Sequence, residues 1–420
     1  MTDSTIQKSL KHNVIFNLLD GASFGFGLGF ASFTTILPLF VSTLTNSALL
    51  IGLIPAIHNV GWQLPQLLTA GKLSRMERYK PLVMLMTINE RLPFLGFAIV
   101  ALLIPKIGSE LALILTFALL IWQGLGAGFT ANGWQNLLSK VIPAEGLATF
   151  LGIQSAASNL LGSVSAILAG IALVNIKQPY NYPAVFLAAF IAFIFSWLFL
   201  NQTKEPPRTI SPAQINSMPM WQNIRNILHR DKVFTGFLVS RFISQFGMMA
   251  FSFYTIYAVK KLGMSNITVG IMTSILFITQ TVANPVLGWL ADRWSRKWIL
   301  VFGGLCNVLS VVLALIIHNT TLFALPFILY GIANTAYWTI GMTIALEFGS
   351  FEEKPTYVGL SNTLAAPATF FAPLLGGFLA DLFSYSVTFY VSIFFGVVTF
   401  FLLIYLARAP LNKIEVNSQK

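Results

Sequence analysis

The sequence contains few charged residues and only one cysteine. Charged residues make up 9% of the 420-residue chain, whereas an average soluble domain has roughly 25%. So few charges would leave the surface of a soluble enzyme uncovered, and the 56% hydrophobic content excludes a disordered chain. The lone Cys306 excludes an intramolecular disulfide, a CxxC redox pair and a cysteine-based metal site. This composition is typical of a polytopic membrane protein.

The sequence motifs of common enzymes are also missing. The chain has no GxxxxGK(S/T) phosphate-binding loop, no HExxH, no CxxCH, and no GxSxG on a credible strand-to-helix turn. We therefore expect no enzymatic activity, no ATP hydrolysis within this chain, no cofactor and no bound metal.

Twelve apolar runs have the length of about 20 residues that crosses ~30 Å of hydrocarbon. A run such as 183–200, PAVFLAAFIAFIFSWLFL, does not alternate polar with apolar residues, so these runs are helices and not barrel strands. The sequence predicts an all-α membrane protein with twelve transmembrane helices in two pseudo-symmetric six-helix bundles. The predicted spans are about 14–41, 48–71, 81–104, 111–138, 148–175, 183–201, 233–259, 267–291, 298–318, 322–347, 358–382 and 387–407.

Lysine and arginine are distributed unevenly between the connecting segments. One side carries 19 of them and the other carries 4, which places both termini in the cytoplasm by the positive-inside rule. The net charge of +11 is then a signal of topology and does not indicate nucleic acid as a partner. The first span is too long for a signal-peptide core, and we interpret it as a retained helix. We expect a multi-pass protein of the plasma membrane, the inner membrane of a bacterium.

A long polar segment divides the chain into halves. We assign residues 1–201 and 233–420 to the two bundles, and residues 202–232 to a cytoplasmic linker. The linker begins with the proline-broken TKEPPRTISP. It ends with MPMWQNIRNILHR, whose apolar residues recur at helical spacing, as in an amphipathic helix at a membrane interface.

The two halves are related in sequence. GKLSRMERYK at 71–80 corresponds to GWLADRWSRK at 288–297. PAEGLATFLGIQSA at 143–156 corresponds to SFEEKPTYVGLSNT at 350–363, in the same order. These two matches indicate a duplication, and parallel six-helix repeats are a known transporter architecture.

The segment 288–297 resembles the loop signature of the major facilitator superfamily, which is a glycine, three residues, Asp-Arg and then a basic pair. These positions are Gly288, Asp292, Arg293, Arg296 and Lys297. With twelve spans, a long central loop and both ends inside, the resemblance covers nearly the whole chain. It implies two bundles that alternate access, and a latch that closes the cytoplasmic side in the outward-open state.

The residues of this motif also have a physical interpretation that does not depend on the resemblance to the family. Gly288 allows two helices to approach closely, and the Asp292 carboxylate is favoured at the N-terminus of a neighbouring helix. We expect that helix to be the fifth span, which starts near Ala148. The alternative is a positive-inside loop with no further role. The copy at 71–80 has Arg75 in place of the aspartate, so a gate role is not expected there.

Four ionisable residues fall inside predicted spans, where a charge costs at least ~2.5–3.5 kcal/mol and so requires a partner, water or a function. Asp20 is a candidate coupling site for protons, and Arg241 is its modulator or an anchor for an anionic substrate. The alternative for both is a structural salt bridge. Glu90 and Arg91 are neighbours on one helix and point about 100° apart. We therefore expect them not to pair with each other, and to bond to the first, second or fourth span.

Uncharged polar and aromatic residues outline a candidate substrate cavity. Such residues either face a water-filled cavity or join helices together, and the sequence does not decide between these two interpretations. Aromatic side chains crowd the seventh span, including Phe246, which favours a hydrophobic or amphipathic substrate. The polar candidates are Asn59, Gln63, Gln66, Gln123, Gln280, Asn284, Asn334, Tyr337 and Trp338.

These features predict a secondary transporter, with proton-coupled export of a small amphipathic molecule as the preferred function. Uptake of a sugar-like or anionic metabolite, lipid flipping, and a non-transporting sensor or scaffold with the same fold are the alternatives. The expected partners are a small-molecule substrate, protons as the coupling ion and the lipid bilayer, and the chain is expected to be a monomer.

Overall fold

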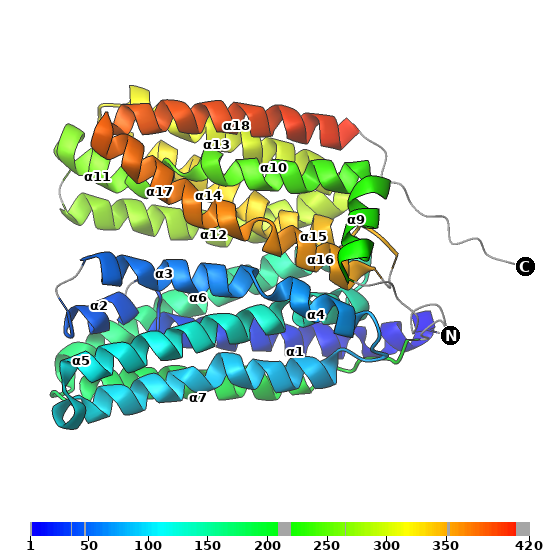
Figure 1. Cartoon of the computed structure of the whole chain (residues 1–420), viewed down its shortest axis with the longest axis horizontal. Coiled ribbons are helices and arrows are strands. Elements are labelled where there is room, and N and C mark those ends of the chain that lie inside the picture. Colours follow the sequence, from blue (N-terminus) through cyan, green and yellow to red (C-terminus); the bar gives the residue numbers. More distant parts are fainter. Residues whose placement is uncertain are drawn as a thin grey trace, which may run out of the picture. The chain divides into compact units, whose positions relative to one another are not determined.

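The computed structural model describes residues 2–34, 36–45, 48–208, 220–264, 266–350 and 353–408. Across these ranges the chain is helical and forms no β-strand (Figure 1), which confirms the predicted all-α class. It divides into two compact units. The first contains Met1–Pro143 and Ile153–Thr209, and the second contains Ala144–Gly152 and Ile210–Lys420.

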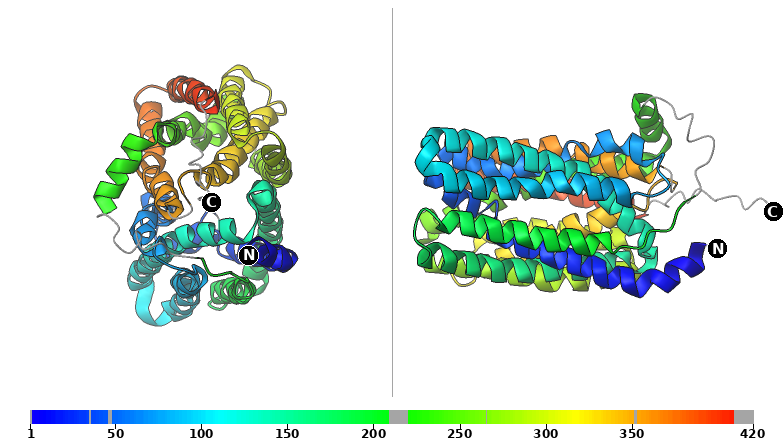
Figure 2. Two further views of the ribbon diagram at one scale, coloured as in Figure 1. Left: turned by 90° about the vertical axis from the view of Figure 1, so that its right-hand side faces the viewer. Right: turned by 90° about the horizontal axis from the view of Figure 1, so that it is seen from below.

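In the first unit, α1 and α5 both pack along α7, and α3 packs along α5. Its core is aromatic, because Phe94, Phe97, Phe186 and Phe193 are completely buried and their rings contact one another. The end-on view in Figure 2 shows these helices across their axes. The helices are α1 (Thr2–Phe30), α2 (Ile36–Ser42), α3 (Ala48–Gln63), α4 (Gln66–Leu73), α5 (Lys80–Val141), α6 (Ala144–Asn175) and α7 (Asn181–Asn201). The first turns of α6 belong to the second unit.

In the second unit, α10 and α13 pack against α18, and α12 and α13 pack against α14. Tyr254, Phe323 and Phe389 lie at the centre of its core. The helices are α9 (Met220–Arg230), α10 (Lys232–Met248), α11 (Phe251–Leu262), α12 (Asn266–Arg293), α13 (Arg296–Ile316), α14 (Ala324–Thr335), the π-helical turn η1 (Ala336–Ile340), α15 (Gly341–Ala345), α16 (Lys354–Thr363), α17 (Ala366–Leu382) and α18 (Tyr385–Arg408).

Seven helices in the described part of the chain are long and apolar enough to cross a membrane. One of them, the 62-residue α5, contains the two predicted spans 81–104 and 111–138. It changes direction at Gly108, whose φ of 78° is a conformation that favours glycine. Other predicted spans consist of two or more shorter helices, as α1 and α2 form 14–41. The count of seven therefore does not confirm twelve spans, although every predicted span is occupied by helix.

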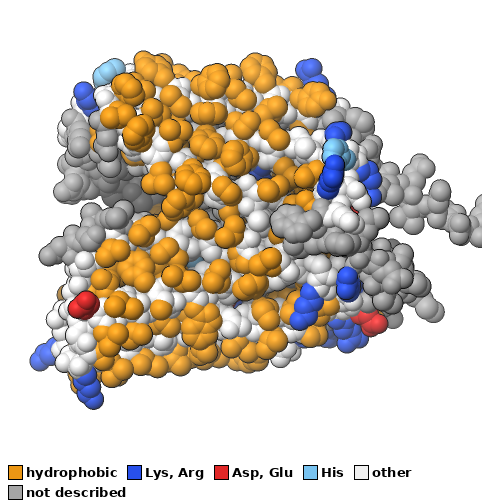
Figure 3. Space-filling model, viewed as in Figure 1, with side chains coloured by type: hydrophobic (Ala, Val, Ile, Leu, Met, Phe, Trp, Pro, Cys, Tyr) orange, Lys and Arg blue, Asp and Glu red, His pale blue; other side chains and the backbone are white. Residues whose placement is uncertain are grey.

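Apolar side chains cover the middle of the molecular face seen in Figure 3, and basic side chains lie toward its ends. Large hydrophobic residues are exposed along the spans, among them Ile167, Phe394 and Tyr405, which are 66%, 63% and 75% exposed. Such a surface is stable in lipid and would aggregate in water. The chain is a multi-pass membrane protein.

The helix α9 differs from the expected membrane-surface helix. Its apolar residues Ile224 and Ile227 are buried within the protein, and α9 packs against α10. At its end, the Arg230 guanidinium contacts the Glu353 carboxylate at 2.7 Å. Hydropathy alone does not distinguish burial against lipid from burial against protein, and here the partner is protein.

Candidate functional site

Three helices of the first unit bury a group of ionisable side chains at a depth within the predicted spans. Asp20 comes from α1, Glu90 and Arg91 from α5, and Ser196 from α7. Their exposed fractions are 4%, 8%, 6% and 0%. We refer to these four residues as the buried charge cluster.

Arg91 connects the members of the buried charge cluster. One guanidinium nitrogen, Nη2, donates a hydrogen bond of 2.9 Å to Ser196 Oγ and lies 3.7 Å from Asp20 Oδ1. The Ser196 hydroxyl in turn donates to Asp20 Oδ1 at 2.6 Å. The other nitrogen, Nη1, lies 3.6 Å from Glu90 Oε2. A guanidinium can bind two carboxylates in this way because its donors point in fixed, divergent directions.

The pairing of Glu90 with Arg91 shows that one expectation was wrong. The 100° angle between neighbouring helix positions does not separate them, because both side chains are long enough to bend toward each other. Arg91 does bond to the first span, as expected for a structural partner. Its contact with Ser196 in the sixth predicted span was not foreseen, since a serine within an apolar run carries no signal in the sequence.

The charges of the cluster do not balance when all groups are ionised. Asp20 and Glu90 contribute two negative charges and Arg91 one positive charge, so one negative charge remains buried. A buried charge without a counter-charge is expensive, and binding one proton makes the cluster neutral. The arrangement is therefore suited to hold a single exchangeable proton on a carboxylate.

In the second unit, Arg241 of α10 lies between segments of two other helices. Its Nη2 donates to Asn362 Oδ1 of α16 at 2.9 Å, and its Nη1 is near Gly341 of α15. Nη1 is buried and has no hydrogen-bond partner among the described residues. Arg241 also forms no ion pair within the described ranges, so this cation has spare capacity for an anionic group.

The glycine and aspartate of the loop motif contact the start of α6, within the second unit. Asp292 accepts hydrogen bonds from the backbone N–H of Ala148 at 3.3 Å and of Thr149 at 2.7 Å, and from the Thr149 hydroxyl at 2.7 Å. This is the helix start that the sequence predicts as the partner of Asp292. A Cβ on Gly288 would lie 2.4 Å from the Ala148 carbonyl oxygen, so only glycine fits at this distance.

The basic residues of the motif have different roles. Arg296 contacts Asp292 at 2.7 Å and Glu347 at 2.5 Å, and also donates to the Ala144 carbonyl. Lys297 is buried. Arg293 is exposed, and its guanidinium lies 4.4 Å from the centre of the Trp289 ring. Arg296 therefore belongs to the contact, and Arg293 lies outside it.

The corresponding loop of the first unit, residues 71–80, is held by the beginning of the linker. Glu205 accepts hydrogen bonds from the backbone N–H of Tyr79 and of Lys80, both at 2.8 Å. Arg208 donates to the carbonyl of Leu73, the last residue of α4, at 3.1 Å, and to two carbonyl groups just beyond it, Ser74 at 2.5 Å and Met76 at 2.7 Å. An anion at a helix N-terminus and a cation at a helix C-terminus are both stabilising. Burial also raises the pKa of Tyr79 to about 12.

Three of the nine predicted polar candidates take part in hydrogen bonds that join helices. Gln123 Oε1 lies 2.9 Å from His58 Nδ1, and Asn284 Oδ1 accepts from Thr339 at 2.6 Å. Gln66 accepts at its backbone carbonyl from Asn132 at 2.8 Å. Asn59 and Trp338 are exposed, Gln63 is buried, and the remaining candidates, Gln280, Asn334, Tyr337 and Phe246, are half-buried. The Phe246 ring packs against Phe242 and Phe395.

Two further features could not be recognised in the sequence. One is Asn362, the partner of Arg241. The other is the π-helical turn η1 in the span 322–347, a distortion often found at functional sites. The described residues contain no group of three or more His, Cys, Asp and Glu side chains able to hold a metal ion.

Comparisons with known proteins agree on one family. The model of the Major Facilitator Superfamily matches residues 237–420. The MFS-type transporter SLC18B1 of Rattus norvegicus is 25% identical over 61% of this chain and 57% of its own length. The multidrug resistance protein MdtG of Dickeya zeae is 28% identical over 30% of this chain and 31% of its own length. The quinolone resistance protein NorA of Staphylococcus aureus is 22% identical over 38% of this chain and 41% of its own length.

Solved structures agree in fold over almost the entire chain. The transporter FucP in its outward conformation superposes with a TM-score of 0.74 at 13% identity, covering 94% of this chain and 99% of that one. The proton:xylose symporter XylE superposes with a TM-score of 0.71 at 14% identity, covering 95% and 96%.

Proposed function

Because the chain belongs to the major facilitator superfamily, we propose that it is a secondary transporter that exports a small amphipathic molecule in exchange for protons. The observation that carries proton coupling is the buried charge cluster, with two carboxylates against one guanidinium. Export is supported by the resistance proteins to which the chain is similar. We place the protein in the plasma membrane, with both termini in the cytoplasm.

In this proposal, proton binding changes the relative stability of the access states. With a proton bound, the cluster is neutral and tolerates a dry environment between α1, α5 and α7. After the proton leaves, one uncompensated negative charge remains and favours a state in which water reaches the cluster. We prefer Asp20 as the proton carrier, because the Ser196 hydroxyl that donates to its ionised carboxylate can rotate and accept a hydrogen bond from the protonated form.

The test is proton movement driven by substrate in proteoliposomes. Asp20→Asn keeps the shape of the side chain and removes its titration, so coupled proton flux should disappear while substrate binding remains. Glu110→Gln is the matched control, because Glu110 is an exposed acid of α5 that lies outside the buried charge cluster. Undiminished coupled flux in Asp20→Asn excludes Asp20 from the mechanism.

A second candidate function, transport of an anionic compound, is favoured by Arg241 alone. Its unused donor Nη1 could bind a carboxylate or phosphate of the substrate. Binding of an anionic and a cationic substrate of similar size to the Arg241→Ala variant separates these cases. A selective loss of the anion supports this function, and equal losses indicate that Arg241 is structural.

We further propose that the contact of Asp292 with the start of α6 is a cytoplasmic latch. It joins residues from the two sequence halves through hydrogen bonds to a helix N-terminus, where a carboxylate adds about 0.3–1 kcal/mol at exposed sites and up to ~2 kcal/mol when partly buried. Such a contact is strong enough to bias access and weak enough to open.

A further inference from the structure

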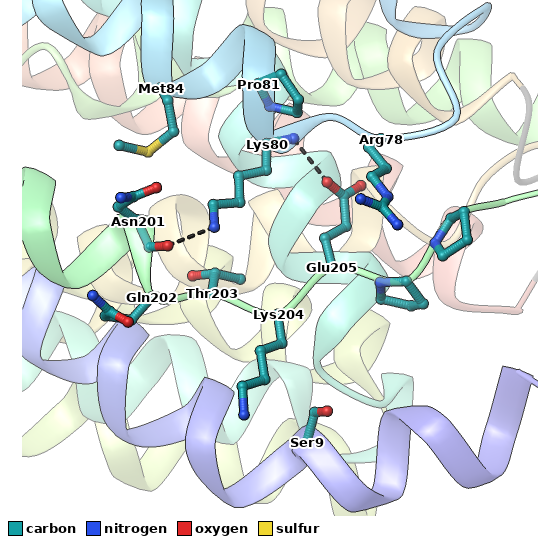
Figure 4. A pocket seen from close by; sticks show the side chains of 12 residues that line it. Ser9, Arg78, Lys80, Pro81, Met84, Asn201, Gln202, Thr203, Lys204 and Glu205 are labelled. Carbon is teal, nitrogen blue, oxygen red and sulfur yellow. Dashed lines mark hydrogen bonds between the residues drawn. The ribbon is translucent and has the colours of Figure 1, made fainter.

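A cavity in the first unit has no part in the proposed transport cycle. It has a volume of about 830 Å³ and opens where α1, α5 and α7 meet the beginning of the linker (Figure 4). Ser9 lines it from α1, Lys80 and Met84 from α5, and Lys204 from the linker. This volume is in the range of about 300–1,000 Å³ that is typical of small-molecule sites.

The lining of this cavity is basic. Arg78, Lys80 and Lys204 contribute three positive charges, and Glu205 is the one acid. The Glu205 carboxylate is already paired, because it accepts from Lys140 Nζ at 2.7 Å. Glu205 therefore does not neutralise the three cations that line the cavity.

The three cations differ in whether their side chains already have a partner in the protein. Lys80 Nζ donates to the Asn201 carbonyl at 2.5 Å, which fixes it in the wall, and Figure 4 shows this bond. Arg78 and Lys204 are exposed, and neither side chain forms an ion pair with any described residue. These two side chains are available to a ligand that enters the cavity.

Two apolar residues of the lining, Pro81 and Met84, lie at the end of a predicted span, and two others, Pro206 and Pro207, belong to the linker. Pro81 and Met84 begin the predicted span 81–104, and Asn201 ends the span 183–201. Their position corresponds to the level of lipid headgroups. Basic pockets between transmembrane helices on the cytoplasmic side bind anionic headgroups, because the cations meet the phosphate while the acyl chains stay in hydrocarbon.

We propose that this cavity binds the phosphate group of an anionic phospholipid through Arg78, Lys80 and Lys204. A soluble phosphate could supply the same chemistry, and the apolar lining at Pro81 and Met84 favours the lipid.

The experiment measures thermal unfolding of the purified full-length protein in detergent, titrated with short-chain phosphatidylglycerol, short-chain phosphatidylcholine or inorganic phosphate. Phosphatidylglycerol should raise the unfolding temperature in a saturable manner, and zwitterionic phosphatidylcholine should not. A basic side chain at an anionic headgroup changes affinity roughly fivefold. Arg78→Gln combined with Lys204→Gln should therefore weaken the apparent affinity by about 25-fold.

The matched control is Lys106→Gln, which removes the same charge from an exposed lysine about 26 residues further along α5 and so ~39 Å away along the helix. It should keep the full response to phosphatidylglycerol. If inorganic phosphate reproduces a response that the double variant loses, the site is supported and its ligand is soluble. If the double variant responds like the wild type, or if no phosphate compound has an effect, the proposal is overturned.

Discussion

Replacing Arg91 by glutamine removes the only cation of the buried charge cluster. Asp20 and Glu90 then remain as two buried carboxylates, and the excess of negative charge rises from one to two. Removing one partner of a buried ion pair typically costs about 3–5 kcal/mol, because the remaining charge is left uncompensated. For a folding unit of this size, 1 kcal/mol corresponds to roughly 2–4 °C. We expect the unfolding temperature of Arg91→Gln to fall on the order of 10 °C.

The same charge count predicts a milder effect for the acid variants. In Asp20→Asn the pair of Glu90 and Arg91 remains, and its net charge is zero. The loss is then limited to one charge-assisted hydrogen bond, about 1.5–3 kcal/mol at most. Combining Asp20→Asn with Arg91→Gln returns the excess to one negative charge, so the double variant should be more stable than Arg91→Gln alone.

Differential scanning fluorimetry of the detergent-purified variants measures all three effects. Arg225→Gln serves as the control, because it removes an exposed arginine from α9. An Arg91→Gln variant that unfolds at the wild-type temperature would show that Arg91 does not balance the two carboxylates. A double variant that loses the sum of the two single losses would show that the charges do not interact.

Four further variants test other parts of the structure. Asp292→Asn should shift the population toward the inward-open state, measured by cysteine accessibility from each side, and an unchanged ratio removes the latch. Gly288→Leu should prevent the same contact, because a Cβ would lie 2.4 Å from a carbonyl oxygen, and it should resemble Asp292→Asn in that assay. Arg208→Gln should expose the 71–80 loop to limited proteolysis at least several-fold faster, since three carbonyl groups lose their donor; wild-type cleavage rates would contradict its anchoring role. Arg241→Ala should reduce the affinity for an anionic substrate by about tenfold or more, measured by equilibrium binding, with little change for a cation.

Hydropathy was sufficient to predict the helical class, and helix occupies each of the apolar runs that it marks. This works because lipid offers no partners to the backbone, so each crossing must be a helix of minimum length. The motif around Gly288 and Asp292 was also readable, since the close approach and the charge at a helix start depend on residue type. The breaks within spans were not predicted, because tertiary contacts decide where a transmembrane helix is broken into shorter helices.

The pairing of the intramembrane charges could not be predicted from the sequence. Asp20 and Arg91 are 71 positions apart in the chain, and nothing local indicates which helices bring them together. Their bridging residue, Ser196, looks like any small residue in an apolar run. The orientation of α9 was equally hidden, because an apolar stripe has the same pattern whether it faces lipid or protein.

The anchoring of the linker at both ends determines where the polypeptide could be divided. Glu205 and Arg208 belong to the first unit, and Ile224 and Ile227 are buried in the second. A protein expressed as two separate polypeptides keeps these contacts only if the cut falls between residues 209 and 219. The sixth predicted span ends at residue 201, so hydropathy alone would suggest a first fragment that stops at residue 202. That cut separates Glu205 and Arg208 from the fragment whose 71–80 loop they hold, and the two fragments should fail to assemble.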